Sequence, residues 1–275
     1  MFSAFKIIRP LNTVFTFSIV SGFCFLINPH LHFYVIIITG LCAGLSAAAG
    51  NIINDIVDVK IDAINKPNRV LPSGKMSIRG AFTLYYLLVS TSIFLSLQIS
   101  IISFCIVLTA NLMLMLYSLR FKGIPGIKNI TIAFLAAMIF IYAGTVAGNL
   151  KLSIFPAIFA FLSTLLREII KDIEDITGDA DAGLLTFPIR FGEFFTLIVI
   201  RTTSALLIVS CCLAYYTDSL SIYFFLMVML FVSPLIVSLN KKVLQNESDF
   251  KTKGISKLAK LIMVLGFVSI LLGLC

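Results

Sequence analysis

Charged side chains are scarce in this sequence, and tryptophan is missing altogether. Only 12% of the 275 residues are charged, while 59% are hydrophobic. A soluble domain carries about a quarter charged residues, and the mean hydropathy here is +1.06. The scarcity of charge excludes an ordinary soluble domain. It predicts an integral membrane protein surrounded by membrane lipids.

Several common signatures of catalytic and metal sites are also missing. The six cysteines form no Cys-x-x-Cys pair and all lie in apolar segments, so we expect buried thiols and no sulfur-bound metal. There is no Walker-type glycine loop, no Gly-x-Gly-x-x-Gly fingerprint and no serine nucleophile elbow. Nucleotide chemistry and acyl transfer therefore lack support. His30 and His32 have no acidic neighbour and are interpreted as surface residues.

Long apolar runs dominate the sequence. A membrane-spanning helix needs about 20 mostly apolar residues, and nine segments meet this requirement. They are too long for barrel strands and lack barrel alternation. Because the joints are short, we expect one all-α transmembrane domain over residues 1–275. The predicted spans are 11–28, 34–54, 80–97, 100–119, 129–148, 152–171, 194–216, 219–239 and 255–274.

The net charge of +8 is interpreted as a sign of membrane orientation and not of nucleic-acid binding, because Lys and Arg in short loops stay cytoplasmic. With nine spans, alternate joints face the same side, and only Lys151 falls on the side opposite the basic one. We therefore predict a multi-pass cell-membrane protein with a cytoplasmic N-terminus and an external C-terminus. The basic side holds Lys6, Arg9, Lys60, Lys66, Arg69, Lys75, Arg79, Arg120, Lys122, Lys128, Lys171, Arg190, Lys241, Lys242, Lys251, Lys253 and Lys257.

The acidic residues concentrate in two segments. Nine of the thirteen lie there, each group at the end of an apolar run and on the basic side. Residues three or four apart share one face of a helix, so each group forms a row. The two rows are Asn54, Asp58 and Asp62 with Asp55 beside them, and Asp172, Asp175 and Asp179 with Glu168 one turn earlier.

Like charges at this spacing destabilise a helix and raise each other's pKa, so a positive partner should offset them. Magnesium suits the role because it takes oxygen ligands, keeps several waters and shares itself with substrate phosphates. One acidic run at a membrane edge is usually a solvated loop face. Two runs in helical register on one side favour a functional site, because acids in membrane segments are costly and usually functional.

Basic residues adjoin both acidic rows, and together they predict a polyanion site. The segment NKPNRVLPSGK follows the first row, and YSLRFKGIPGIK follows the fourth span. Lys and Arg bind phosphate oxygens directly. The positive-inside rule alone accounts for most of these cations. Their place beside the acids singles out Arg69 and Lys122.

The row of Asn54, Asp58 and Asp62 resembles the first aspartate motif of the UbiA-type intramembrane prenyltransferases, and NRVLPSG resembles the loop that follows it. Asp175-x-x-x-Asp179 resembles the second motif, and GLLTFPIRFG the stretch behind it. YSLRFK and RPLN are similar to the family's segments after helix 4 and before helix 1. The sequence departs from the family at Val70, where proline is common, and at Phe121, where many members have lysine.

This resemblance implies nine helices around a central cavity, two Mg²⁺ ions and a prenyl diphosphate donor. It assigns one ion to Asn54, Asp58 and Asp62 with support from Asp55. It assigns the other to Asp175 and Asp179 with Asp172 beside them. Diphosphate-binding candidates are Arg69, Lys122, Lys66, Tyr117, Arg120 and Lys171, and both Arg120 and Lys122 stay open because of Phe121. Arg9 and Asn12 are the acceptor-binding candidates.

Three functions remain open at this stage, and a metal-dependent alcohol phosphotransferase is disfavoured because it would need a single tight aspartate signature. REIIKDIEDITGD looks most like the archaeal lipid branch of the family, which joins a second geranylgeranyl chain to geranylgeranylglyceryl phosphate, a lipid phosphate acceptor. An aromatic acceptor such as 4-hydroxybenzoate or a quinone precursor is the alternative within the family. A cation-coupled transporter is the alternative of another class, because acid pairs in membrane helices also carry ions. Both acidic rows lie at helix ends on one side, which suits a one-sided active site better.

Overall fold

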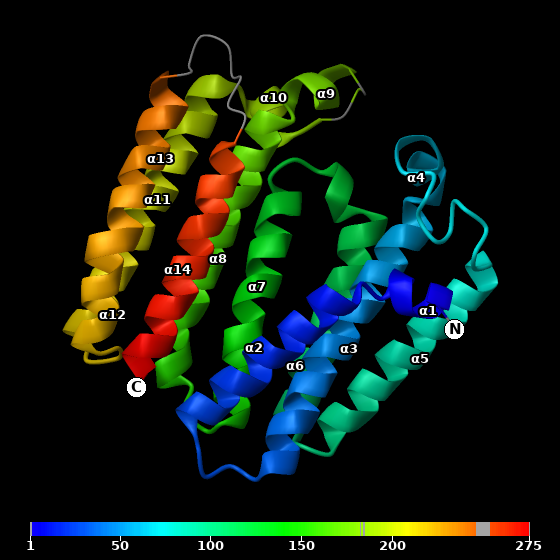
Figure 1. Ribbon diagram of the computed structural model, residues 1–275, viewed down its shortest axis with the longest axis horizontal. Coiled ribbons are helices and arrows are strands. Elements are labelled where there is room, and N and C mark those ends of the chain that lie inside the picture. Colours follow the sequence, from blue (N-terminus) through cyan, green and yellow to red (C-terminus); the bar gives the residue numbers. More distant parts are fainter. Residues whose placement is uncertain (1, 182, 184, 246–253, 275) are drawn as a thin grey trace. The chain divides into compact units, whose positions relative to one another are not determined.

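The computed structural model describes residues 2–181, 183, 185–245 and 254–274, and these ranges contain helices and no strand (Figure 1). Nine helical segments in this described part are long and apolar enough to cross a membrane, which confirms the predicted all-α class. They are α2 (Pro10–Ile27), α3 (Phe33–Val57), α5 (Ile78–Leu97), α6 (Ile101–Leu119), α7 (Ile127–Val146), α8 (Lys151–Glu174), α11 (Glu193–Tyr216), Ile222–Val243 and α14 (Ile255–Leu274).

Short helices and one irregular span complete the described chain. The span Ile222–Val243 consists of α12 (Ile222–Met227), a π-helix (Val228–Val232) and most of α13 (Ser233–Gln245). The short elements are α1 (Phe2–Ile7), α4 (Val59–Asn65), a 3₁₀ turn (Phe121–Gly123), α9 (Ile176–Asp181) and α10 (Phe187–Phe191).

The helices form two compact units. The first comprises residues 1–121 and 142–149, and the second comprises residues 122–141 and 150–275. Helix α7 therefore contributes to both units. The single domain over residues 1–275 and the central cavity that the resemblance implies stay predictions.

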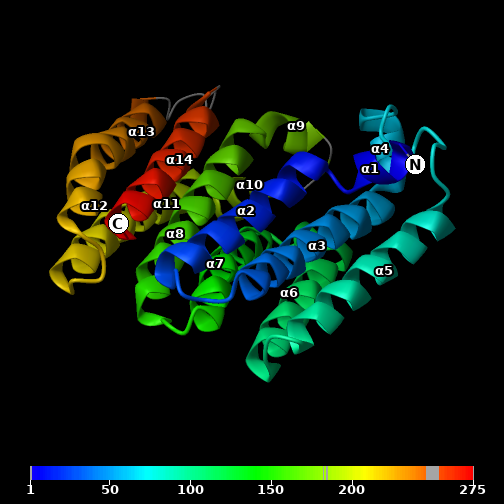
Figure 2. The ribbon, with the colours of Figure 1, turned by 60° about the horizontal axis from the view of Figure 1, so that its bottom comes forward.

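In the first unit, α3 packs against α2, α5 and α6 (Figure 2). Small residues on α3 permit the close approach, as is usual between membrane helices. A Cβ at Gly40 would lie 2.0 Å from Ser21 Oγ. Further along the same helix, Ser46 accepts a hydrogen bond of 2.9 Å from Asn111 Nδ2 on α6. The polar and small positions of α3 thus fix how its neighbours pack, where lipid supplies no hydrophobic driving force.

In the second unit, α8 packs against α11 and α14. Gly266 on α14 lies against Phe159 on α8, and a Cβ there would come within 1.8 Å of the ring. The π-helix precedes Pro234 by two residues. Proline lacks the N–H that would bond the carbonyl four residues earlier, so the widened turn accommodates the proline without ending the span. After it, Asn240 donates a 3.0 Å hydrogen bond to Ser204 on α11.

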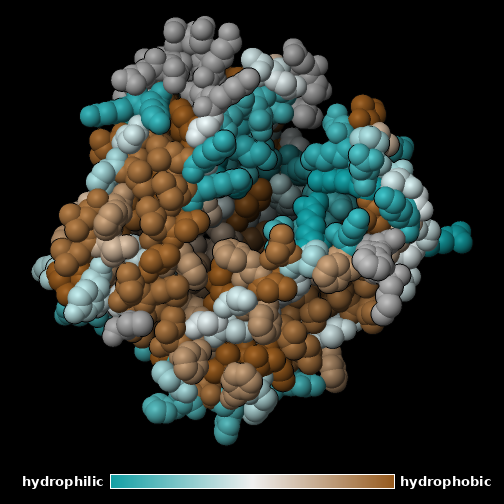
Figure 3. Space-filling view, in the orientation of Figure 1, coloured by the Kyte–Doolittle hydropathy of each residue, from teal (hydrophilic) through white to brown (hydrophobic). Residues whose placement is uncertain are grey.

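The outer surface of the second unit is apolar over α12, α13 and α14 (Figure 3). In the π-helix between α12 and α13, the large hydrophobic side chains Leu230 and Phe231 are exposed, as expected for residues that face lipid. Among the cysteines, Cys24, Cys42 and Cys211 are buried, but Cys105 and Cys212 are exposed. The prediction of burial was wrong for these two, because a membrane surface tolerates an exposed thiol as readily as a core does. Cys275 lies outside the described residues.

Candidate functional site

The first acidic row lies at a break between two helices. Helix α3 ends at Val57, α4 begins at Val59, and Asp58 between them has φ −82° and ψ 0°. This conformation belongs to the sparsely populated bridge region, where many active-site residues lie. The backbone N–H of Asp58 still bonds to the carbonyl of Asn54, and that of Asp62 to Asp58. The row therefore keeps its i, i+4 spacing while the chain bends.

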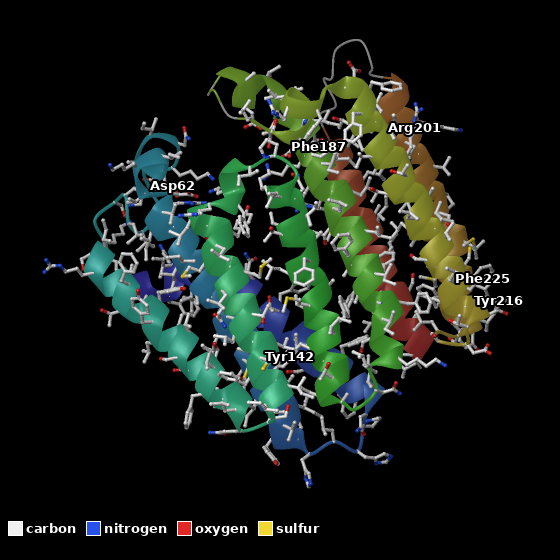
Figure 4. The ribbon with its side chains drawn as sticks, turned by 180° about the vertical axis from the view of Figure 1, so that it is seen from behind. Asp62, Tyr142, Phe187, Arg201, Tyr216 and Phe225 are labelled. Carbon is white, nitrogen blue, oxygen red and sulfur yellow. The ribbon has the colours of Figure 1, made fainter. Side chains whose placement is uncertain are left out.

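Arginines compensate the buried carboxylates of this row. Arg9 Nη2 lies 2.5 Å from Asp55 Oδ1, and Arg69 Nη1 lies 3.2 Å from the same oxygen. Arg69 also pairs with Asp62, which Figure 4 labels near α4. Asn54 Nδ2 donates a 3.1 Å hydrogen bond to Asp58 Oδ2. Two carboxylates, Asp55 and Asp62, thus pair with two guanidinium groups within the first unit.

Both arginines are held in place by their backbones. Arg9 separates α1 from α2 and has φ +52°, a left-handed conformation that is uncommon for a residue other than glycine. Arg69 lies in the loop after α4, and the next two residues, Val70 and Leu71, are buried against α3 and α5. Local strain and local burial of this kind are common where a side chain must be presented at a site.

The second acidic row repeats this geometry in the second unit. Helix α8 ends at Glu174, α9 begins at Ile176, and Asp175 between them has φ −92° and ψ 1°. The N–H of Asp179 bonds to the carbonyl of Asp175 at 2.9 Å. Glu174 at the same corner accepts 2.9 Å hydrogen bonds from the N–H groups of Gly254 and Ser256. It thereby caps the start of α14.

Asp172 is the buried carboxylate of the second row, and both of its oxygens are engaged. Lys128 Nζ lies 2.6 Å from Oδ1, and Asn129 Nδ2 donates a 2.9 Å hydrogen bond to Oδ2. The Asp172 side chain is 5% exposed and that of Lys128 is 20% exposed. Glu168, one turn earlier, is buried and pairs with Arg167.

The remaining acids of the second row are less well compensated. Burial raises the pKa of Asp179, and the neighbouring charges of Asp175 and Asp172 raise it further, while Lys128 and Lys171 lower it. Asp175 is exposed and Asp179 is half-buried. A bound cation would offset both the burial and the repulsion from the neighbouring carboxylates.

The donor atoms fit magnesium. Asn54, Asp58, Asp175 and Asp179 offer amide and carboxylate oxygens, the ligands that Mg²⁺ prefers. Among the described residues, no group of three His, Cys, Asp or Glu side chains is arranged to hold a metal by itself. Magnesium usually keeps several waters and takes one or two carboxylates together with substrate phosphates. An incomplete protein shell is therefore the expected form of such a site.

The other predicted site residues are exposed or half-buried. In the first unit, Lys66, Arg120 and Asn12 are exposed and Tyr117 is half-buried; in the second, Lys122 and Lys171 are exposed. Arg9 and Arg69, which the sequence assigned to phosphate-bearing substrates, contact acids. Lys251 and Lys253, predicted to lie on the basic side, are outside the described residues.

Sequence reasoning missed the role of Lys128 and Asn129. Lys128 was counted only among the basic residues of its segment, and Asn129 drew no attention. The only signal in the sequence was a lysine followed by an asparagine at the start of an apolar span. Polar residues are common at that position, so the pair does not stand out. The contact with Asp172 joins residues 44 positions apart, a separation that spacing along one helix does not reveal.

Comparisons with known proteins cover nearly the whole chain. A family model described as the UbiA prenyltransferase family matches residues 14–273. A protein from Methanosphaera stadtmanae named digeranylgeranylglyceryl phosphate synthase is 34% identical over 268 residues, 98% of this chain and 97% of that one. A protein of the same name from Methanococcus aeolicus is 35% identical over 238 residues, 86% and 84% of the two chains.

Solved structures resemble the chain equally broadly. A structure concerned with digeranylgeranylglyceryl phosphate synthase in membranes has a TM-score of 0.90 at 27% identity, covering 99% of this chain and 97% of that one. A UbiA homologue from Archaeoglobus fulgidus bound to GPP and Mg²⁺ has a TM-score of 0.70 at 22% identity, covering 98% and 99%. The second likeness concerns the fold alone.

Proposed function

The chain belongs to the UbiA prenyltransferase family and is a prenyltransferase, and from this premise we propose its reaction. It transfers a geranylgeranyl group from geranylgeranyl diphosphate to the hydroxyl of geranylgeranylglyceryl phosphate and releases diphosphate. The proposal is carried by one observation: the two acidic rows, each at a helix break, are each joined to cations of their own unit. Relatives that are 34% and 35% identical bear the name of this lipid synthase, which favours the lipid acceptor.

Two magnesium ions complete the proposed site. Asn54, Asp58 and Asp62 would hold one, and Asp175 and Asp179 would hold the other. When bound, magnesium neutralises the diphosphate and makes it a better leaving group. A structural neighbour bound to GPP and Mg²⁺ supports this cofactor and the prenyl diphosphate donor.

The chain's own residues bind and orient the donor. Arg69 and Lys122 donate to its phosphate oxygens, and Lys66, Arg120 and Lys171 are further candidates, with Tyr117 beside them. Arg69 suits the task because a guanidinium can bind two phosphate oxygens at once. Asp55 and Asp62 fix the position of that guanidinium before the donor arrives.

The transfer itself needs little acid–base help from the protein. The allylic C–O bond breaks and its electron pair leaves with the diphosphate. The acceptor hydroxyl forms the new ether bond, and its proton passes to water. Both histidines lie in the loop before α3, at the end of that helix opposite the first acidic row, so no imidazole base adjoins that row. Arg9 and Asn12 are proposed to face the acceptor's phosphate.

The acceptor is tested by offering the purified protein geranylgeranyl diphosphate with each acceptor in turn. A diether lipid phosphate should form with geranylgeranylglyceryl phosphate, and no prenylated product should form with 4-hydroxybenzoate. The Asp58→Ala variant serves as the inactive control. Prenylation of the aromatic acid alone would overturn the proposed acceptor and leave the family unchanged. A transporter, in contrast, would release no diphosphate with either acceptor.

A further inference from the structure

Lys128 lies where a cation is unfavourable for its own helix. It occupies the first turn of α7, two residues after Gly126, whose φ of +81° begins the helix. The N-terminus of a helix carries partial positive charge, so a lysine there is disfavoured and an anion is favoured. The contact with Asp172 offsets this unfavourable interaction between Lys128 and the start of its own helix.

Both carboxylate oxygens of Asp172 are already bonded, which suits a residue that positions other side chains. One oxygen accepts from Lys128 Nζ and the other from Asn129 Nδ2. A magnesium ion bound to the same carboxylate would lie close to the lysine ammonium, and the two positive charges would repel. The exposed Asp175 and half-buried Asp179 carry no such contact with Lys128 in hydrogen-bond range among the described residues.

Unsatisfied hydrogen-bonding capacity remains beside this ion pair. An ammonium has three N–H donors, and Lys128 uses one on Asp172. Asn129 is fully buried, and its Oδ1 has no partner within the described chain. The amide cannot turn to satisfy that oxygen without losing its bond to Asp172. Buried polar atoms are normally paired, so we expect a further hydrogen-bonding group to bind beside Lys128 and Asn129.

We propose that Lys128 binds a phosphate group at the second acidic row, and that Asp172 positions Lys128 and is not a metal ligand. This deepens the proposed function and rests on it. The first unit supports the idea by its parallel arrangement, in which buried Asp55 holds Arg9 and Arg69. Each row then contains a buried carboxylate that orients cations, Asp55 in the first and Asp172 in the second, and other acids that remain for magnesium. Asp62 also pairs with Arg69, but through Oδ2, whereas both oxygens of Asp172 are engaged. The phosphate belongs either to the donor's diphosphate or to the acceptor.

The test uses the double variant Lys128→Met/Asp172→Asn of the full chain. Removing both charges avoids leaving one buried charge unpaired, which would destabilise the fold. Binding of inorganic diphosphate and of geranylgeranylglyceryl phosphate is measured by calorimetry at saturating Mg²⁺. Affinity for one of the two should fall roughly tenfold or more, as for the loss of a charged hydrogen bond. The ligand that is affected identifies the phosphate.

Two further variants separate positioning from metal binding. Mn²⁺ binding, followed by electron paramagnetic resonance, should stay within about twofold of wild type in Asp172→Asn and fall markedly in Asp175→Asn. Lys128→Arg should retain most of the phosphate affinity, and Lys151→Met, an exposed lysine at the start of α8, should change nothing.

Two outcomes would overturn the inference. One is wild-type affinity of the double variant for both phosphate compounds. The other is a loss of Mn²⁺ in Asp172→Asn as large as in Asp175→Asn. Failure of the proposed function has a different signature: wild-type protein that binds Mg²⁺ and diphosphate but transfers no prenyl group.

Discussion

At the scale of single residues, Asp58 and Asp175 are counterparts. Each lies between two helices with φ near −90° and ψ near 0°, and each has a side chain that reaches solvent at least in part. Replacing either with alanine should abolish prenyl transfer, because the proposed magnesium would lose a ligand. The fold should persist, because removing one of several like charges relieves repulsion.

Steady-state turnover and circular dichroism on the same preparation check this prediction. Asp218→Asn is the matched control, since Asp218 has φ +50° and asparagine tolerates that conformation. Near-normal turnover of Asp58→Ala or Asp175→Ala at saturating magnesium would show that the affected row holds no essential ion.

A second prediction concerns the binding of the diphosphate by Arg69. Arg69→Lys keeps the charge but cannot contact Asp55, Asp62 and a phosphate with one planar fork. We expect kcat/KM for the donor to fall by roughly ten- to a hundredfold, the size of one or two charge-assisted hydrogen bonds. Arg79→Lys, at an exposed position at the start of α5, should leave kcat/KM unchanged. Equal values for both variants would remove Arg69 from the proposed site.

Residue spacing predicted part of this site and not the rest. The i, i+4 pattern of Asn54, Asp58 and Asp62 survives in the structure because the backbone bonds continue through the bend. The bend itself was not predictable from that pattern, since one residue in the bridge region leaves the spacing intact. The pairing of Asp172 with Lys128 depends on tertiary structure and left no trace in local sequence.

At the scale of helices, apolar length predicted the spans because a bilayer demands it. The ends were less predictable. Helix α3 continues to Val57 and α8 to Glu174, three residues beyond the predicted limits of 54 and 171, because polar residues at a membrane edge can remain helical. The π-helix before Pro234 was also missed, although the proline itself was a visible signal of irregularity.

Close packing of α8 and α14 yields a stability prediction. Gly266→Ala would drive a methyl group into the buried ring of Phe159. Overpacking of this kind costs about 1–3 kcal/mol, which should appear as a lower midpoint of thermal unfolding in detergent. Adding Phe159→Leu should recover part of the loss.

Gly22→Ala on α2 is the matched control for that experiment. A Cβ at Gly22 would meet nothing within 4 Å, and alanine in a helix is favoured over glycine by about 0.5–1 kcal/mol. The control should therefore be neutral or slightly stabilising. A comparable loss of stability in both variants would show that glycine content, and not the contact with Phe159, determines the result.

At the scale of the whole molecule, charge predicts orientation. The acidic rows and the basic segments beside them are expected on the cytoplasmic side, and Lys151 on the opposite side. In intact cells, a membrane-impermeant thiol reagent should label a Lys151→Cys variant and spare a Lys60→Cys variant. Both positions are exposed, so both should react once the membrane is opened. Labelling of both in intact cells would refute the nine-span topology.

The π-helix in the eighth span changes the rotation of α13 about its own axis. A π turn holds one residue more than an α turn, and each residue of an α-helix advances about 100° around the axis. Everything after Val232 is therefore rotated by about that angle from where an uninterrupted helix would place it. Deleting one residue from 228–232 would turn Asn240 away from Ser204, its partner on α11. The proline-induced irregularity thus determines which face of α13 meets the protein and which meets lipid.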